Sequence, residues 1–418
     1  MVTESSDQSD DQTPSAVPQP ASTPNDGTQL WSRAYVRLLA IQFMFGLGFS
    51  TFYLLPKYLQ QVYFANAATI GKVTGAALLA AVLTTPLAAI WVGRGQRRAP
   101  AFAGLVLLAA SSVAFAFVDR IGWPLLLLRV VQGTAFCLFT TAIVTRTAEI
   151  VPQDRMGQAI GYLGLAALLT NALSPVIAEP FAELLGWPSV FALAALWGVA
   201  AALSALRIDD PPDSSGREPL DFNVLRLPAL RSILFAAVIC GVALGVMFTY
   251  AQTLAMLRGA RHVGAFFSGY ALLAGCVRVL FGNMADRLGR KGVSIIAMLA
   301  YGFVLLLTAA VTPGTLFWAG AGLGAAHGIL YPALNALAFE HSSSNSRGMV
   351  AASFSGAFSL GYALGVLNLG FVANSWGLPV IFVMTAASTL AGAWALTSIR
   401  PIEAEQVRPI ISPRSQPD

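Results

Sequence analysis

Three charged side chains lie inside long apolar stretches of this sequence, namely Arg129, Glu179 and Arg278. A charge in such a stretch is costly unless it meets a partner, carries a proton or holds a ligand of opposite charge. Arg129 follows Trp123 by six residues, and Glu179 precedes Gly186 by seven. If both stretches are helices, these two side chains lie at similar depth. We therefore expect Arg129 and Glu179 to pair or to compete for a proton.

Each of these residues also has a simpler interpretation. Arg129 can be a structural residue that caps backbone carbonyls, and Glu179 can reach the interface at the end of its stretch. Arg278 either binds an anionic group or supports the loop that follows it, and we favour the second interpretation. His327, in a further apolar stretch, titrates near neutrality, but a lone histidine is more often a hydrogen-bonded packing residue.

One short polar break contains an acid and three bases, in the order Gly282-Asn-Met-Ala-Asp286-Arg287-Leu-Gly289-Arg290-Lys291. Asp286 at a helix end can accept hydrogen bonds from the amides at the N-terminus of a facing helix. Arg290 can pair with a carboxylate on a neighbouring helix, and Glu340 is placed for that contact. Gly282 lets helices approach, and Gly289 allows a tight turn. The cluster predicts a latch that forms in one conformational state and breaks in another; an ordinary positively charged loop is the alternative.

Long apolar runs must position these residues. Hydrophobic residues make up 56% of the 418-residue chain and charged residues only 11%, against about 25% in soluble domains. This composition excludes a soluble enzyme, a nucleic-acid-binding protein and a disordered scaffold, and the unbroken runs exclude an outer-membrane barrel. Runs of 19–24 residues can cross a bilayer as helices. They predict an all-α integral membrane protein with twelve transmembrane helices, at 34–55, 72–92, 99–119, 123–146, 158–181, 188–206, 229–252, 266–285, 292–311, 315–338, 348–371 and 378–398.

The positive charges between these runs predict an orientation. Of the 25 Lys and Arg residues, 18 fall on one side of the expected bundle, 5 on the other and 2 inside it. Lys57 and Lys72 are assigned to loops on the side with fewer positive charges. Because cytoplasmic loops carry the excess of Lys and Arg, we expect both termini in the cytoplasm. The protein would then be a multi-pass protein of the cell's inner (plasma) membrane.

The expected helices fall into two halves of six. The predicted order is a disordered cytoplasmic tail (1–29), the N-terminal half (30–206), a cytoplasmic linker (207–228), the C-terminal half (229–399) and a second cytoplasmic tail (400–418). The halves resemble each other at an offset of about 190 residues: Gly186-Trp-Pro before the sixth helix matches Gly377-Leu-Pro before the twelfth. Such duplication is typical of transporters, with the substrate site between the halves.

The charged motif from Gly282 to Lys291 and the layout of six plus six helices resemble the major facilitator superfamily of secondary transporters over residues 30–400. In that family the motif is a conserved cytoplasmic loop that stabilises the outward-facing state. The resemblance implies this role for Gly282, Asp286, Arg287, Gly289, Arg290 and Lys291. The corresponding loop of the first half has Gly93 where the family usually has Asp, so the resemblance implies an acid-dependent latch in the second half.

Two further segments are similar to family motifs. Arg129-Val-Val-Gln132-Gly133 is similar to the RxxQG signature, in which the arginine is implicated in proton coupling. The segment from Thr170 to Pro180 occupies the place of the antiporter motif. Pro175 fits that motif, whereas Glu179 and its neighbours Ser174 and Ala178 depart from it.

The family also implies that helices one, four, seven and ten line the substrate cavity. Their small polar and aromatic residues suit an apolar or weakly polar ligand, although ordinary hydrogen bonding between helices accounts equally for most of them. The candidates are Gln42, Gln132, Thr140, Thr141, Tyr250, Gln252, His327, Tyr331 and Asn335.

These patterns predict a proton-coupled secondary active transporter that exports a small hydrophobic compound or metabolite by alternating access. A proton symporter that takes up a sugar or an organic anion is the alternative within the class. The positive charges of Arg129 and Arg278 are compatible with an organic anion as its substrate. A polytopic membrane enzyme or receptor is the alternative from another class. The sequence has no catalytic constellation, metal-ligand spacing or nucleotide-binding loop, so we expect no enzyme, no cofactor and no metal. The expected partners are a small-molecule substrate, protons and the lipid bilayer but no nucleic acid, and we expect a monomer.

Overall fold

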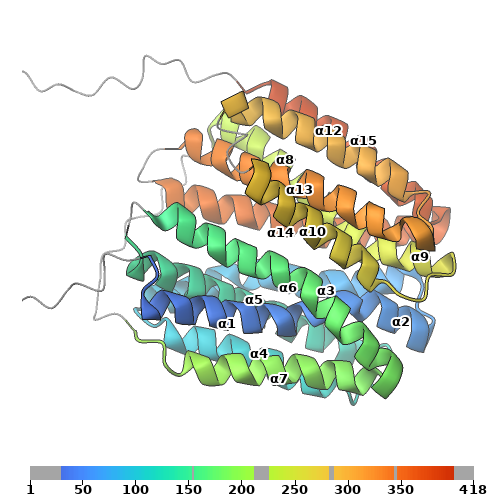
Figure 1. The fold of residues 1–418 in the computed structure, drawn as a ribbon, viewed down its shortest axis with the longest axis horizontal. Coiled ribbons are helices and arrows are strands. Elements are labelled where there is room, and N and C mark those ends of the chain that lie inside the picture. Colours follow the sequence, from blue (N-terminus) through green and yellow to red (C-terminus); the bar gives the residue numbers. More distant parts are fainter. Residues whose placement is uncertain (1–29, 153–154, 211–225, 282–286, 343–345, 400–418) are drawn as a thin grey trace, which may run out of the picture.

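The computed structural model describes residues 30–152, 155–210, 226–281, 287–342 and 346–399. Within these ranges the regular elements are all helices, arranged as two bundles that lie side by side (Figure 1). Among the described residues, ten helical segments are long and apolar enough, by length and composition, to cross a membrane. With α10, which is slightly shorter, and α13, which is long but carries several glycines, the described chain has the twelve segments that the sequence predicts.

The first six segments form the first half. Their elements are α1 (Arg33–Ser50), η2 (Thr51–Leu54) and α2 (Leu55–Tyr63) as one interrupted segment, then α3 (Ala67–Gly93), α4 (Arg98–Phe115), α5 (Trp123–Ile150), α6 (Met156–Leu185) and α7 (Trp187–Ala205).

The second half repeats this plan. Its elements are α8 (Pro228–Val246), η5 (Met247–Ala251) and α9 (Gln252–Leu257) as one interrupted segment, then α10 (Gly264–Phe281), α12 (Arg290–Thr308), η6 (Pro313–Thr315), α13 (Leu316–Glu340), α14 (Arg347–Trp376) and α15 (Leu378–Thr397).

The first two segments are longer than expected, which corrects the placement of two lysines. The first segment continues to Tyr63 because Pro56 stands in the first turn of α2, where a proline needs no amide hydrogen. The second begins at Ala67, after Asn66 caps it by accepting from the amide of Thr69. Lys57 and Lys72 therefore lie within helices rather than in loops.

The duplication seen in the sequence is confirmed at the turns that lead into α7 and α15. Gly186 and Gly377 have φ values of 80° and 89°, a left-handed conformation that glycine adopts without strain. A proline in the first turn of the next helix follows each of them. The two halves therefore reverse the chain in the same way at equivalent positions.

The bundle has two opposite ends. The linker end is where the described chain begins at α1, crosses from α7 to α8 and finishes at α15 (Figure 1, left). The far end is the opposite end, which contains α2 and α9 (Figure 1, right). The largest hydrophobic cluster crosses between the halves, since it joins Phe52 and Leu55 to Phe248 and Phe266. Packing between the halves therefore includes the segments near the far end.

Candidate functional site

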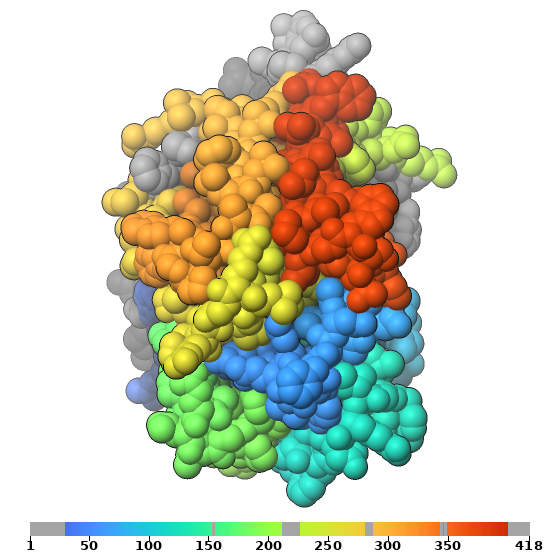
Figure 2. All heavy atoms as spheres, turned by 90° about the vertical axis from the view of Figure 1, so that its right-hand side faces the viewer, coloured from blue at the N-terminus to red at the C-terminus, as the bar shows by residue number. Residues whose placement is uncertain are grey.

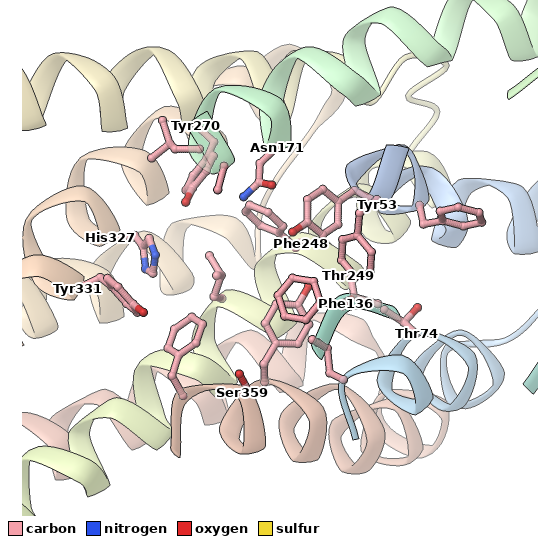
Figure 3. Close-up of a pocket in the computed structure, with 18 of the residues that line it drawn as sticks. Tyr53, Thr74, Phe136, Asn171, Phe248, Thr249, Tyr270, His327, Tyr331 and Ser359 are labelled. Carbon is pink, nitrogen blue, oxygen red and sulfur yellow. The ribbon is translucent and has the colours of Figure 1, made fainter. Parts of the chain in front are cut away.

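A cavity of about 310 Å³ lies between the two halves (Figure 3). Both interrupted segments contribute to its wall, because the 3-10 turn η2 supplies Phe52 and Tyr53 and the π-helical turn η5 supplies Phe248 and Thr249. Irregular turns of this kind inside helices are frequent at functional sites. The remaining wall comes from α1, α2, α3, α5, α6, α8, α10, α13 and α14.

The region of the cavity formed by the second half is aromatic and carries a cation. The ring of His327 lies 6.2 Å from that of Tyr270 and 5.5 Å from that of Tyr331, measured between centroids. Figure 3 shows these three side chains directed into the same space. Arg278 also lines the cavity and is close enough to interact electrostatically with all three. Its Nε atom is buried and has no hydrogen-bond partner among the described residues.

Arg129 occupies the region formed by the first half, and its guanidinium is held by neighbours. It donates to the backbone oxygen of Val73 at 3.2 Å and to Oε1 of Gln132 at 2.5 Å. Its guanidinium carbon lies 5.7 Å from the centroid of the Phe52 ring, within the range of a cation–π contact. Arg129 thus bonds a backbone carbonyl, as its simpler sequence interpretation expects, and it also lines the cavity.

Glu179 does not pair with Arg129, contrary to the sequence-based hypothesis. Its Oε1 lies 2.5 Å from Nζ of Lys57, and the backbone amides of Val263 and Gly264 donate to its two oxygens at 2.7 Å. The expectation failed because it placed Lys57 in a loop, whereas Lys57 lies on α2 with only 1% of its surface exposed. A buried lysine and two backbone amides thus donate to the two oxygens of Glu179.

These contacts belong to a larger closure of the far end that joins the halves. Lys57 also donates to the backbone oxygen of Arg261 at 2.8 Å. Gln252 donates to the backbone oxygen of Tyr53 at 2.9 Å, and Tyr250 donates to that of Ala67 at 3.4 Å. Figure 2, which views the far end, shows the first half (blue, green) meeting the yellow segment of the second half across the middle.

Toward the linker end the cavity continues into open space. Gly157, Gly161 and Gly164 share one face of α6 because they are spaced by four and three residues. Apart from the neighbouring residues and backbone of α6 itself, no described atom lies within 4 Å of the position that a Cβ would take on any of them. Since Gly164 lines the cavity, the open space runs from the cavity along this face.

At the linker end the predicted contact between Arg290 and Glu340 is confirmed, with 3.5 Å between the charged atoms. Lys291 donates to the backbone oxygens of Thr397 and Ile399. Of the other motif residues, Gly289 has the positive φ of a tight turn, at 89°, and Arg287 is exposed. Gly282 and Asp286 lie outside the described residues.

The first half has its own version of this contact. Arg97 pairs with Glu149 at 2.6 Å, at the positions that correspond to Arg290 and Glu340. The acid missing at Gly93 is replaced locally by Asp210, whose Oδ1 accepts from the amides of Arg97 and Arg98 at the start of α4. A carboxylate at a helix N-terminus is favourable because of the helix dipole.

Of the expected cavity residues, His327 and Tyr331 line the cavity and the others lie elsewhere among the described residues. Tyr250 and Gln252 belong to the far-end closure, and Gln132 holds Arg129. Thr140 turns its hydroxyl back to the oxygen of Phe136 in its own helix. The remaining candidates outside the cavity lining are Gln42, Thr141 and Asn335.

Sequence reasoning missed Lys57, Tyr53, Phe248 and Tyr270. The aromatic residues carry no signal that separates a cavity wall from a core. Lys57 does carry a signal, because a charged residue stands directly after Pro56 within an apolar run that resumes at Tyr58.

Three potential metal ligands come together near the far end, but their environment does not favour a metal. Atoms of Glu179, Glu183 and His262 lie within 4.8 Å of one another. Lys57 contacts both carboxylates, at 2.5 and 3.3 Å, and supplies the positive charge that a metal would bring.

The chain is similar to known proteins both in sequence and in fold. A family model described as Major Facilitator Superfamily matches residues 38–261 and again residues 258–416. The multidrug resistance protein MdtG of Proteus mirabilis is 25% identical over 372 residues, which cover 82% of this chain and 90% of that protein. The fold is similar to a mutant of the nucleoside transporter NupG, with a TM-score of 0.75, 14% identity and coverage of 87% of this chain and 99% of that one. It is also similar to the human organic anion transporter MFSD10, with a TM-score of 0.68, 16% identity and coverage of 90% and 100%.

Proposed function

The chain belongs to the Major Facilitator Superfamily and is therefore a multi-pass membrane transporter rather than an enzyme, and from that premise we propose that it is a proton-coupled exporter of small, largely apolar compounds. The cavity wall is rich in aromatic side chains, which suit such compounds. The relative named as a multidrug resistance protein supports export over uptake.

The observation that carries the proposal is the position of the cavity between two halves that close at one end. The Lys57–Glu179 ion pair and the amides of Val263 and Gly264 hold the far end together, while open space reaches the cavity along α6. This is the arrangement that one state of an alternating-access cycle requires. The opposite state needs these far-end contacts to break.

Within this proposal Arg129 and Glu179 couple transport to protons by different means. Glu179 is the partner of Lys57 in the closed far end, so its carboxyl group is free of that ion pair only when the far end opens. The hydrogen bond from Arg129 to the backbone oxygen of Val73 holds its positive charge in the cavity wall, next to the contact between α3 and α5. The motif contact of Arg290 with Glu340 joins α12 to α13 within the second half and so shapes the linker end of that half.

The excess of Lys and Arg further supports an orientation with the linker end in the cytoplasm. In that orientation the cavity of this conformation faces the cell interior. Cysteine substitutions of the exposed residues Phe64 and Phe117 at the far end should react with a membrane-impermeant maleimide in intact cells. Reaction only after the cells are permeabilised would contradict the orientation.

Transport is tested in inside-out vesicles with an imposed pH gradient and a panel of small compounds. We expect gradient-dependent accumulation of at least one compound, loss of the gradient effect after an ionophore, and loss of it in Arg129→Gln. Arg120→Gln, which removes an exposed positive charge at the far end, is the matched control and should retain the flux. Flux that ignores the gradient would refute proton coupling, and flux only in right-side-out vesicles would favour the uptake alternative.

A further inference from the structure

The cavity carries positive charge without a matching acid. Its charged lining residues among those described are Arg129 and Arg278, and neither Asp nor Glu contributes to the wall. Glu179 is occupied by Lys57 and by two backbone amides. A cationic ligand would therefore meet two guanidinium groups and no counter-charge, which is unfavourable in a low-dielectric site.

The two arginines differ in whether their guanidinium groups already have hydrogen-bond partners. Arg129 is only 5% exposed and already bonds Val73 and Gln132. Arg278 has no hydrogen bond or ion pair to a described residue, although its Nε atom is buried. A buried donor without a partner costs free energy, and a guanidinium presents further donors in a planar fork.

A structural role for Arg278 explains only part of this geometry. It lies in the last turn of α10, where the helix dipole favours a cation. That interaction does not give Nε a partner. The sequence-based preference for Arg278 as a support of the following loop therefore finds no described contact in its favour, whereas its place in the cavity wall favours ligand binding.

The surroundings of Arg278 indicate the shape of the ligand. Tyr270, His327 and Tyr331 surround the adjacent space with rings, and Phe358 lies across from His327 at 6.0 Å between centroids. Flat apolar groups pack well against such walls. We propose, on the basis of the function proposed above, that the substrate is an amphipathic organic anion whose acidic group binds Arg278 while its flat apolar body lies among these rings.

The proposal is tested with three compounds that share a naphthalene body: 2-naphthoate, neutral 2-naphthamide and cationic 2-naphthylmethylammonium. Binding to the purified full chain in lipid nanodiscs is measured by calorimetry. We expect naphthoate to bind about 10-fold more tightly than the amide, the scale of one hydrogen bond to a charged group. The ammonium compound should bind most weakly.

Variants of Arg278 then test whether this residue causes the preference for naphthoate. Arg278→Gln should weaken naphthoate binding by about 10-fold and leave naphthamide binding unchanged. Arg278→Lys should retain part of the preference, and Arg120→Gln should retain all of it. Equal binding of the three compounds by the unchanged protein, or an unchanged preference in Arg278→Gln, would overturn the proposal. If Arg278→Gln does not fold, binding of the three compounds to the unchanged protein and to Arg278→Lys tests the proposal instead.

The same compounds separate this inference from the proposed function. Gradient-driven flux of the ammonium compound without flux of naphthoate would refute the anion preference and leave proton-coupled export intact. Selective naphthoate binding without any gradient-driven flux would support the anion site and refute the coupling.

Discussion

At the residue scale, burial makes Lys57 and Glu179 depend on each other. They are 1% and 5% exposed, so either charge would be left in a poorly solvated place without its partner. Breaking a buried pair by removing one member costs about 3–5 kcal/mol, whereas replacing both with apolar residues can be nearly neutral. We expect Glu179→Gln to lower the melting temperature of the purified protein clearly, and the double change Lys57→Met with Glu179→Gln to recover part of that loss, because the glutamine oxygen can still accept from a backbone amide.

Glu183→Gln is the matched control for this prediction. Glu183 also contacts Lys57, at 3.3 Å, but its side chain is 41% exposed. An exposed pair of this kind contributes about 0–1 kcal/mol. A melting temperature that falls equally for Glu179→Gln and Glu183→Gln would contradict the assignment of the closure to the buried pair.

The same residues show how far sequence reasoning reaches. Glu179, Arg129 and Arg278 were found because a charge inside an apolar run is conspicuous. Their partners were not found, since the contact of Lys57 with Glu179 joins residues 122 positions apart and depends on how two helices pack. Arg290 and Glu340 were paired correctly because a charged motif and a repeated carboxylate restricted the choice.

At the scale of helices, close packing explains why a glycine follows the arginine signature. A Cβ on Gly133 of α5 would overlap the backbone oxygen of Ala77 on α3. The contact that this glycine permits also brings α3 close enough for Arg129 to bond the oxygen of Val73. The RxxQG pattern thus contains both the charge and the spacing that its hydrogen bond requires.

We predict that Gly133→Ala separates α3 from α5 and lowers both stability and coupling. Overpacking of this kind costs about 1–3 kcal/mol, measurable as a lower melting temperature. Gly157→Ala is the control, because its added Cβ meets no described atom and alanine favours helix. Equal stability of the two variants would show that the α3–α5 contact tolerates the extra methyl group.

Helix number and order followed from the apolar runs, but the interruptions did not. The 3-10 turn Thr51–Leu54 and the π-helical turn Met247–Ala251 leave the hydropathy pattern unchanged. They place aromatic residues in the cavity wall, and α2 and α9 continue from them into the far-end closure. The sequence therefore predicted the bundle, whereas the points at which two of its helices change course required the structure.

At the scale of the whole molecule, the two ends should move in opposite directions. The far end is closed by Glu179, which is held by Lys57 and the amides of Val263 and Gly264. Removing this buried carboxylate leaves Lys57 without its partner, so the closed far end becomes less stable. If each half moves as a packed unit, opening at the far end closes the linker end.

Spin labels at exposed positions test this reciprocity. One pair at Phe64 and Leu257 reports on the far end, and another at Gln158 and Leu280 reports on the linker end, with Cys276 replaced by serine. In Glu179→Gln we expect longer distances for the first pair and shorter ones for the second than in the unchanged protein, because the ion pair is absent. Unchanged distances in this variant would mean that other contacts hold the far end, and a change at one end alone would contradict the rigid movement of the halves.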